Sequence, residues 1–145
     1  GPARAEVEKQ LPHAVFTGGL GGEDLPRAVA SMDVFCSTGE LETFCQAVQE
    51  AKACGLPVIS PRKGGPIDLI DPSRTGWLYE PGDMTDFRSR VVDLVGDDYK
   101  RHAMGIAARA SIENRTWENL CAELVEHYKE AIRLAGRSTR IRAVL

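Results

Sequence analysis

Glu42 and Glu50 are the residues whose type and spacing best suit chemistry on a ligand. They flank the start of a predicted helix, and its first backbone amides, on Phe44, Cys45 and Gln46, would lack partners within the helix. Together with the helix dipole, such amides favour the binding of a phosphate group. The segment follows a predicted strand, and in doubly wound folds ligands bind at the carboxyl ends of the strands.

The distance between the two carboxylates indicates the kind of ligand. A rise over eight residues of continuous helix would separate them by about 12 Å. An acid/base pair in an inverting glycosidase is at most about 9.5 Å apart, so such a pair is not expected. The separation suits an extended ligand with a phosphate group in the middle and hydroxyls at both ends, such as a nucleotide sugar. On spacing alone, an alternative is that Glu42 interacts with the helix dipole and Glu50 is a solvated surface charge.

The sequence marks both ends of this helix. Thr43 is the predicted N-cap, and Gln46 stands three residues later, as in a capping box. Gly55 stands where a left-handed residue commonly ends a helix. Between these ends, apolar residues recur at helical spacing, namely Phe44, Ala47, Val48, Ala51 and Cys54.

Short apolar runs alternate with helical patterns along the chain, which predicts an α/β domain with a parallel sheet. The expected strands are residues 14–18, 33–37, 57–61 and 76–80. The expected helices are residues 23–31, 44–54, 84–95, 98–113 and 117–135, the last ended by Gly136. Trp77 and Trp117 are expected in the core. The basic segment 136–145 is expected to be a solvated tail or a docking strap.

The composition is that of a soluble globular domain of 145 residues, 43% of them hydrophobic and 27% charged. No apolar run approaches the roughly 20 residues of a membrane helix, and no signal peptide is expected, since the first residues are polar and charged. A net charge of −3 and only 6% aromatic residues argue against nucleic-acid binding. No Cys-x-x-Cys pair occurs, so a zinc site has no support. The four cysteines are expected to be reduced and mostly buried in a cytosolic protein.

Gly64 and Gly65 follow the third predicted strand and precede Pro66, which is a favourable first residue of a helix. These glycines could let the backbone approach a ligand in a cleft, or they could form only a tight turn. Arg62 and Lys63 directly precede these glycines and could face a phosphate. Solvated charges are the favoured interpretation of this pair.

An ordered set of motifs between Phe16 and Tyr128 resembles the C-terminal domain of a retaining GT-B glycosyltransferase of family 4. The set comprises Phe16-Thr17-Gly18, Asp33-Val34-Phe35, Glu42-Thr43-Phe44, Glu50-Ala51-Lys52-Ala53-Cys54-Gly55-Leu56-Pro57-Val58, Gly64-Gly65, Thr75-Gly76-Trp77-Leu78-Tyr79 and Pro81-Gly82-Asp83. The segment from Thr43 to Glu50, with Gly65-Pro66-Ile67-Asp68-Leu69 downstream, most resembles bacterial GDP-mannose-dependent α-mannosyltransferases that build mannosylated lipids and lipoglycans.

The resemblance implies a donor site without a metal or other cofactor, for a nucleotide sugar that would be GDP-mannose. Glu42 would hydrogen-bond the hexose, and Glu50 would hold the ribose hydroxyls. Many members of the family have glycine at the position of Cys45, which is therefore expected to act through its amide rather than its thiol. No catalytic residue is assigned within the chain. The implied donor-binding residues are Glu42, Thr43, Phe44, Cys45, Gln46 and Glu50, with Gly64 and Gly65 as cleft residues.

The resemblance also implies that the chain is part of a longer protein. Residues 1–135 would form a Rossmann-like parallel sheet with flanking helices that lacks its first two strands, together with the Arg and Lys that bind the donor diphosphate. A lipid or glycan acceptor would bind an N-terminal domain outside this chain, in the cytoplasm at the inner face of the membrane. In the strand order 3-2-1-4-5-6, the strand at 14–18 would lose its neighbours. The strand at 33–37 would become an open edge that favours self-association.

Two other functions remain open at this level. One is a nucleotide-sugar epimerase, which shares the fold but places its catalytic carboxylates and histidines differently. The other is a nucleotide-binding or interaction module without catalysis. The order of the motifs around Glu42 and Glu50 favours the glycosyltransferase.

Overall fold

The computed structural model describes residues 2–138 and contains a parallel sheet of three strands. The strands lie in the order β1 (Phe35–Cys36), β2 (Val58–Pro61) and β3 (Gly76–Tyr79). In the central strand, Val58 pairs with residue Phe35 on one side and with Gly76 on the other. The predicted α/β fold with a parallel sheet is therefore confirmed, and each of these strands is shorter than predicted.

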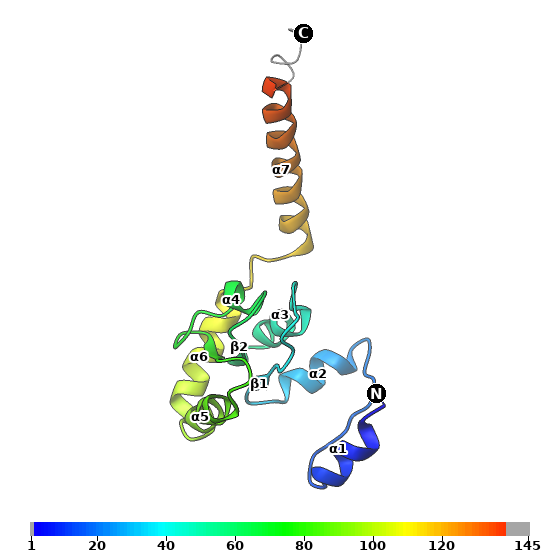
Figure 1. Cartoon of the computed structure of the whole chain (residues 1–145), viewed down its shortest axis with the longest axis vertical. Helices are drawn as coiled ribbons and strands as arrows, with labels where there is room; N and C mark the ends of the chain where they lie inside the picture. The colour runs from blue at the N-terminus through cyan, green and yellow to red at the C-terminus, as the bar shows by residue number, and fades with distance from the viewer. Residues whose placement is uncertain (1, 139–145) are drawn as a thin grey trace.

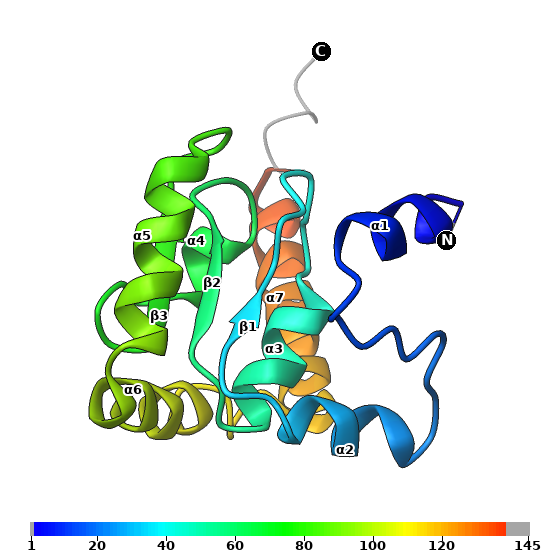
Figure 2. The same cartoon turned by 90° about the horizontal axis from the view of Figure 1, so that it is seen from below.

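Helices cover both faces of the sheet, and Figure 2 shows the strands between α5 on one face and α3 on the other. The helices are α1 (Arg4–Gln10), α2 (Asp24–Ala30), α3 (Gln46–Ala53), α4 (Pro66–Leu69), α5 (Met84–Val95), α6 (Asp98–Ala110) and α7 (Trp117–Ser138).

The core consists of two apolar clusters separated by the sheet. Successive side chains of a strand point to opposite faces, so the fully buried Val58 and Ile59 of β2 enter different clusters. The Val58 cluster joins α2 and α3 to the sheet and includes Val29, Cys45, Val48, Ala51 and Leu78. The Ile59 cluster joins α5 and α6 to the other face and includes Tyr79, Leu94 and Met104. The central strand therefore holds both helical layers.

The prediction of a strand at residues 14–18 is wrong. These residues have no regular secondary structure, Val15 is 88% exposed, and α1 precedes them where no helix was predicted. A strand is stabilised by backbone bonds to a neighbour, and among residues 2–138 no strand pairs with this segment. Its apolar sequence alone therefore does not make it a strand.

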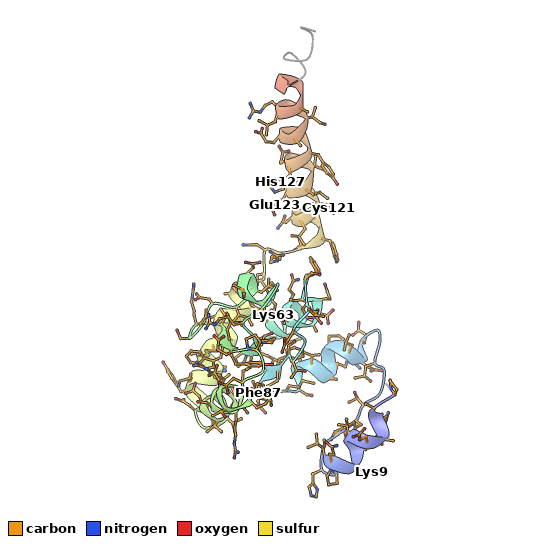
Figure 3. The ribbon with its side chains drawn as sticks, viewed as in Figure 1. Lys9, Lys63, Phe87, Cys121, Glu123 and His127 are labelled. Atoms are coloured by element: carbon orange, nitrogen blue, oxygen red, sulfur yellow. The ribbon has the colours of Figure 1, made fainter. Side chains whose placement is uncertain are left out.

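α7 extends away from the rest of the molecule, as Figure 1 shows. Its side chains, including Cys121, Glu123 and His127, project from the isolated helix in Figure 3. Trp117, predicted to be in the core, is 70% exposed, because the start of α7 packs on little of the body. The helix also continues through Gly136, which was predicted to end it. Among residues 2–138, no helix combines the length and hydrophobicity required to cross a membrane.

Trp77 is only partly buried, and it joins β3 to α5 through a polar cluster. Its Nε1 donates a hydrogen bond to Asp93 Oδ2 at 2.9 Å, and the Arg90 guanidinium lies 4.8 Å from the centre of its ring. Lys100 Nζ donates to Asp93 Oδ1 at 2.6 Å, which adds α6. The hydrogen bond from Lys100 lowers the pKa of the Asp93 carboxyl, and Trp77 and Arg90 add to this shift against the opposing effect of burial.

We predict that Asp93→Asn lowers the free energy of unfolding at neutral pH by about 1 kcal/mol, because the ion pair is partly exposed. The folded-state pKa of Asp93 lies below its unfolded value. The stabilisation is therefore present above an unfolded pKa of about 3.9 and is lost as pH falls through the folded pKa. Urea unfolding across this range measures the effect. Asp33→Asn, whose side chain is exposed, is the control, and equal losses in both variants would contradict the prediction.

Candidate functional site

The predicted site residues lie on loops that leave neighbouring strands at one edge of the sheet. Residues 37–45 follow β1, and residues 62–65 follow β2. Because β1 and β2 are parallel and paired, both loops begin at the same edge. The structure therefore brings Glu42 and Thr43 next to Gly64 and Gly65, which lie far from them in sequence.

The two loops make a close backbone contact. The Gly65 amide donates to the Glu42 carbonyl at 2.9 Å. A Cβ on Gly65 would lie 2.1 Å from the Thr43 carbonyl oxygen, and one on Gly64 would lie 2.5 Å from that of Glu42. Gly64 also has a positive φ of 64°. The close approach that these glycines permit is thus made by the loop before α3.

The start of the helix differs from the prediction. α3 begins at Gln46, with Cys45 as N-cap and no side-chain capping bond, so the capping box of Thr43 and Gln46 is wrong. The first intrahelical bond runs from the Gln49 amide to the Cys45 carbonyl at 3.1 Å. The amides of Cys45, Gln46, Ala47 and Val48 therefore have no partner within the helix. Glu42 lies outside the helix, so the separation of the two glutamates calculated from helical rise does not apply.

Cys45 adopts the left-handed conformation, with φ 54° and ψ 49°. This region favours glycine, which explains why glycine suits this position. The Cys45 side chain is only 3% exposed, and burial raises the pKa of its thiol, with further contributions from the charges of Glu42 and Asp68. The thiol is therefore protonated at neutral pH and is a poor nucleophile.

All four cysteines are free thiols, but the prediction that they are mostly buried is wrong. Cys36 and Cys121 are exposed, and Cys54 is half-buried. The apolar runs around these residues suggested burial. However, β1 lies at the edge of the sheet and α7 extends from the body, so both positions remain open to solvent.

The two glutamates have different surroundings. Glu42 is exposed, whereas Glu50 is half-buried and its Oε1 accepts a hydrogen bond from Gln46 Nε2 at 3.1 Å. Glu50 also lines a surface cavity of about 290 Å³ with Phe44, Gln46, Arg115 and Trp117. Thr43, Phe44 and Gln46 are exposed around it. Glu42 thus precedes the N-terminus of α3, and Glu50 lies one turn inside the helix.

The neighbouring cations form surface ion pairs. Arg62 Nε lies 3.0 Å from Glu80 Oε1, and Lys63 Nζ lies 3.1 Å from Glu40 Oε2. About half of each cationic side chain is exposed, in agreement with the interpretation as solvated charges. Residues 2–138 contain no group of three His, Cys, Asp or Glu side chains suited to a metal ion.

Sequence reasoning missed Gln49 and Arg115. The Gln49 side chain is buried, its Nε2 donates to the Phe44 carbonyl at 2.7 Å, and its Oε1 accepts from Arg115 Nε at 3.2 Å. Gln49 lies beside the apolar stripe of α3, and a polar residue there gives no signal of burial. Arg115 follows 66 residues later, so no local pattern connects the two.

We predict that Gly65→Ala destabilises the protein and displaces the loop of residues 40–45. The φ of Gly65 is −58°, which alanine adopts without strain, so the effect reports the lost space alone. Overpacking of this kind costs roughly 1–3 kcal/mol. Thermal unfolding measures the loss, and Gly21→Ala, with no atom near the added methyl, is the control. A Gly65→Ala variant as stable as Gly21→Ala would refute the loop contact.

Comparison with known proteins identifies related chains. The family model described as glycosyl transferases group 1 matches residues 3–111. A GDP-mannose-dependent alpha-mannosyltransferase of Corynebacterium glutamicum is 43% identical over 94% of this chain and 33% of its own length. The protein of the same name from Mycobacterium tuberculosis is 50% identical over 94% of this chain and 35% of its own length. The chain thus spans about a third of the length of these relatives.

Solved structures agree in fold. Sucrose-phosphate synthase from Thermosynechococcus elongatus superposes with a TM-score of 0.81 at 23% identity, over 92% of this chain and 35% of that one. HepE from Anabaena, solved in complex with UDP, has a TM-score of 0.75 at 22% identity, over 89% of this chain and 37% of that one. At this identity the likeness concerns the fold. The sheet and the extent of the family match lead to one conclusion, that the chain belongs to the glycosyl transferases group 1 family.

Proposed function

We propose that this chain is the donor-binding part of a retaining glycosyltransferase that transfers mannose from GDP-mannose. The observation that carries the proposal is the position of Glu42 just before α3 and of Glu50 one turn inside it, on a helix that follows the carboxyl end of a strand of a parallel sheet. The relatives from Corynebacterium glutamicum and Mycobacterium tuberculosis, which are named GDP-mannose-dependent alpha-mannosyltransferases, support this choice of donor.

Each part of the donor has a counterpart in the site. The diphosphate would accept hydrogen bonds from the amides at the start of α3, whose dipole favours negative charge. Glu42 would accept hydrogen bonds from the hexose hydroxyls. Glu50, held by Gln46, would accept them from the ribose. The UDP complex of HepE supports the use of this fold for a nucleoside diphosphate.

The acceptor in this proposal is a lipid or glycan, bound mainly by the part of the protein outside this chain. The chain spans about a third of its mannosyltransferase relatives, which leaves room for such a domain. Residues 1–135 would be the partial nucleotide-sugar-binding domain, and residues 136–145 a basic tail, most of which lies outside the described residues. We place the reaction in the cytoplasm, at the inner face of the membrane.

We predict that glutamine substitutions distinguish the contacts to the two ends of the donor. Glu50→Gln should weaken binding of both GDP and GDP-mannose by about ten- to a hundredfold, because a charged hydrogen-bond acceptor is lost. Glu42→Gln should weaken GDP-mannose alone, since GDP has no hexose. Calorimetric titration measures both ligands, with the exposed Glu23→Gln as control. Wild-type affinities in both site variants would rule out the assignment.

We also predict that the chain alone does not catalyse transfer and that it self-associates. Incubated with GDP-mannose and a lipid acceptor, it should release no nucleotide, because the residues that bind the acceptor would belong to the rest of the protein.

The expected self-association depends on β1. Among residues 2–138, no strand pairs with the outer edge of β1, and such an edge favours pairing with another chain. Light scattering tests the association. A strictly monomeric chain, or one that releases GDP upon addition of acceptor, would contradict these expectations.

A further inference from the structure

The carbonyl of Phe44 is held by a side chain rather than by the helix. Gln49 Nε2 donates to it at 2.7 Å, from a position one turn inside α3. Because a trans peptide is planar, with its carbonyl and amide pointing in opposite directions, fixing the Phe44 carbonyl also fixes the direction of the Cys45 amide. Along the chain, the Cys45 amide lies between Glu42 and Glu50, the two proposed carboxylate contacts of the donor. Gln49 therefore sets the orientation of a backbone donor in the candidate site.

Gln49 is itself held by the segment between α6 and α7. Its Oε1 accepts a hydrogen bond from Arg115 Nε at 3.2 Å. Among residues 2–138, Arg115 has no carboxylate within ion-pair distance, so the neutral amide is the side-chain acceptor for this guanidinium. A second positive charge is close, since burial and then the charge of Arg115 lower the pKa of the buried Lys52. A substitution at Gln49 would thus affect both ends of this contact.

A second contact joins the same two segments. The rings of Phe44 and Trp117 stack with centroids 6.3 Å apart and an angle of 20° between their planes. Arg115 precedes Trp117, the first residue of α7, and the Arg115 amide donates to the Ile112 carbonyl at 2.9 Å. The side chain and the carbonyl of Phe44 are both therefore tied to the point from which α7 departs.

We infer that Gln49 is a positioning residue that aims the Cys45 amide at the donor, and that Arg115 couples this orientation to the start of α7. The inference rests on the proposed function and adds a residue that acts through the backbone of the loop. Left-handed Cys45 is an uncommon conformation for a residue other than glycine, so the loop needs such support. The loop is held on its other side by Gly65.

The test follows the loop through the Cys45 thiol, which is buried when the loop is in place. Alkylation by iodoacetamide, resolved by site with mass spectrometry, is measured in Gln49→Met, Gln49→Glu, Arg115→Gln and the wild-type chain. Gln49→Glu keeps an acceptor for Arg115 but removes the donor to the Phe44 carbonyl. Arg27→Gln is the matched control, because Arg27 is an exposed arginine outside the cavity that Arg115 lines and pairs only with Glu23 among the described residues. Cys54 serves as internal reference for global unfolding.

We expect Cys45 alkylation to rise about five- to tenfold in both Gln49 variants and about threefold in Arg115→Gln, with Cys54 unchanged. The affinity for GDP, measured by calorimetry, should fall by similar factors. Unchanged Cys45 reactivity in Gln49→Glu would overturn the inference, as would a loop that opens without loss of GDP affinity. If the Gln49 variants unfold, the surface variant Arg115→Gln decides. If the wild-type chain binds no GDP, the proposed function fails, while the thiol rates still test the coupling.

Discussion

The candidate site depends on how closely the backbone of residues 42–43 approaches that of residues 64–65. The hydrogen bond from the Gly65 amide to the Glu42 carbonyl joins the loops after β1 and β2. It requires parallel pairing of these strands, which brings their carboxyl ends to one edge. It also requires positions without Cβ atoms, because a methyl group on Gly65 would overlap the Thr43 carbonyl. This packing of one backbone against the other therefore determines the positions of the proposed donor contacts.

The left-handed Cys45 shows what this packing has to overcome. For a residue with a side chain, that conformation costs on the order of 1–2 kcal/mol. Burial of the Cys45 side chain offsets part of this free energy, since it packs in the same cluster as Val48 and Val58. The Gln49 side chain holds the preceding carbonyl. A strained backbone conformation persists where its surroundings stabilise it. At Cys45 these surroundings are the apolar cluster and the Gln49 side chain.

α7 has a different physical basis from the other helices. Its apolar residues Leu124, Val125, Tyr128 and Ile132 are largely exposed, so tertiary burial contributes little to it. Pairs within the helix, such as Glu126 with Lys129 at 2.7 Å, support it instead. Such pairs are each worth about 0.2–0.5 kcal/mol, which is modest for a helix of this length. The two clusters on either side of β2 stabilise the body without it.

The sequence alone determined the elements whose signals are local. Apolar runs and turn residues predicted the strands at 33–37, 57–61 and 76–80, and periodicity predicted α3, α5 and α6. The motifs from Glu42 to Glu50 also indicated the edge of the sheet where the candidate site lies. Tertiary structure decided what depends on distant neighbours. Residues 14–18 lack a pairing strand, Trp117 lacks a packing surface, and Gln49 meets Arg115 across 66 residues. Cys45 replaced Thr43 as the N-cap because the neighbouring loop, not the capping box, fixes the backbone there.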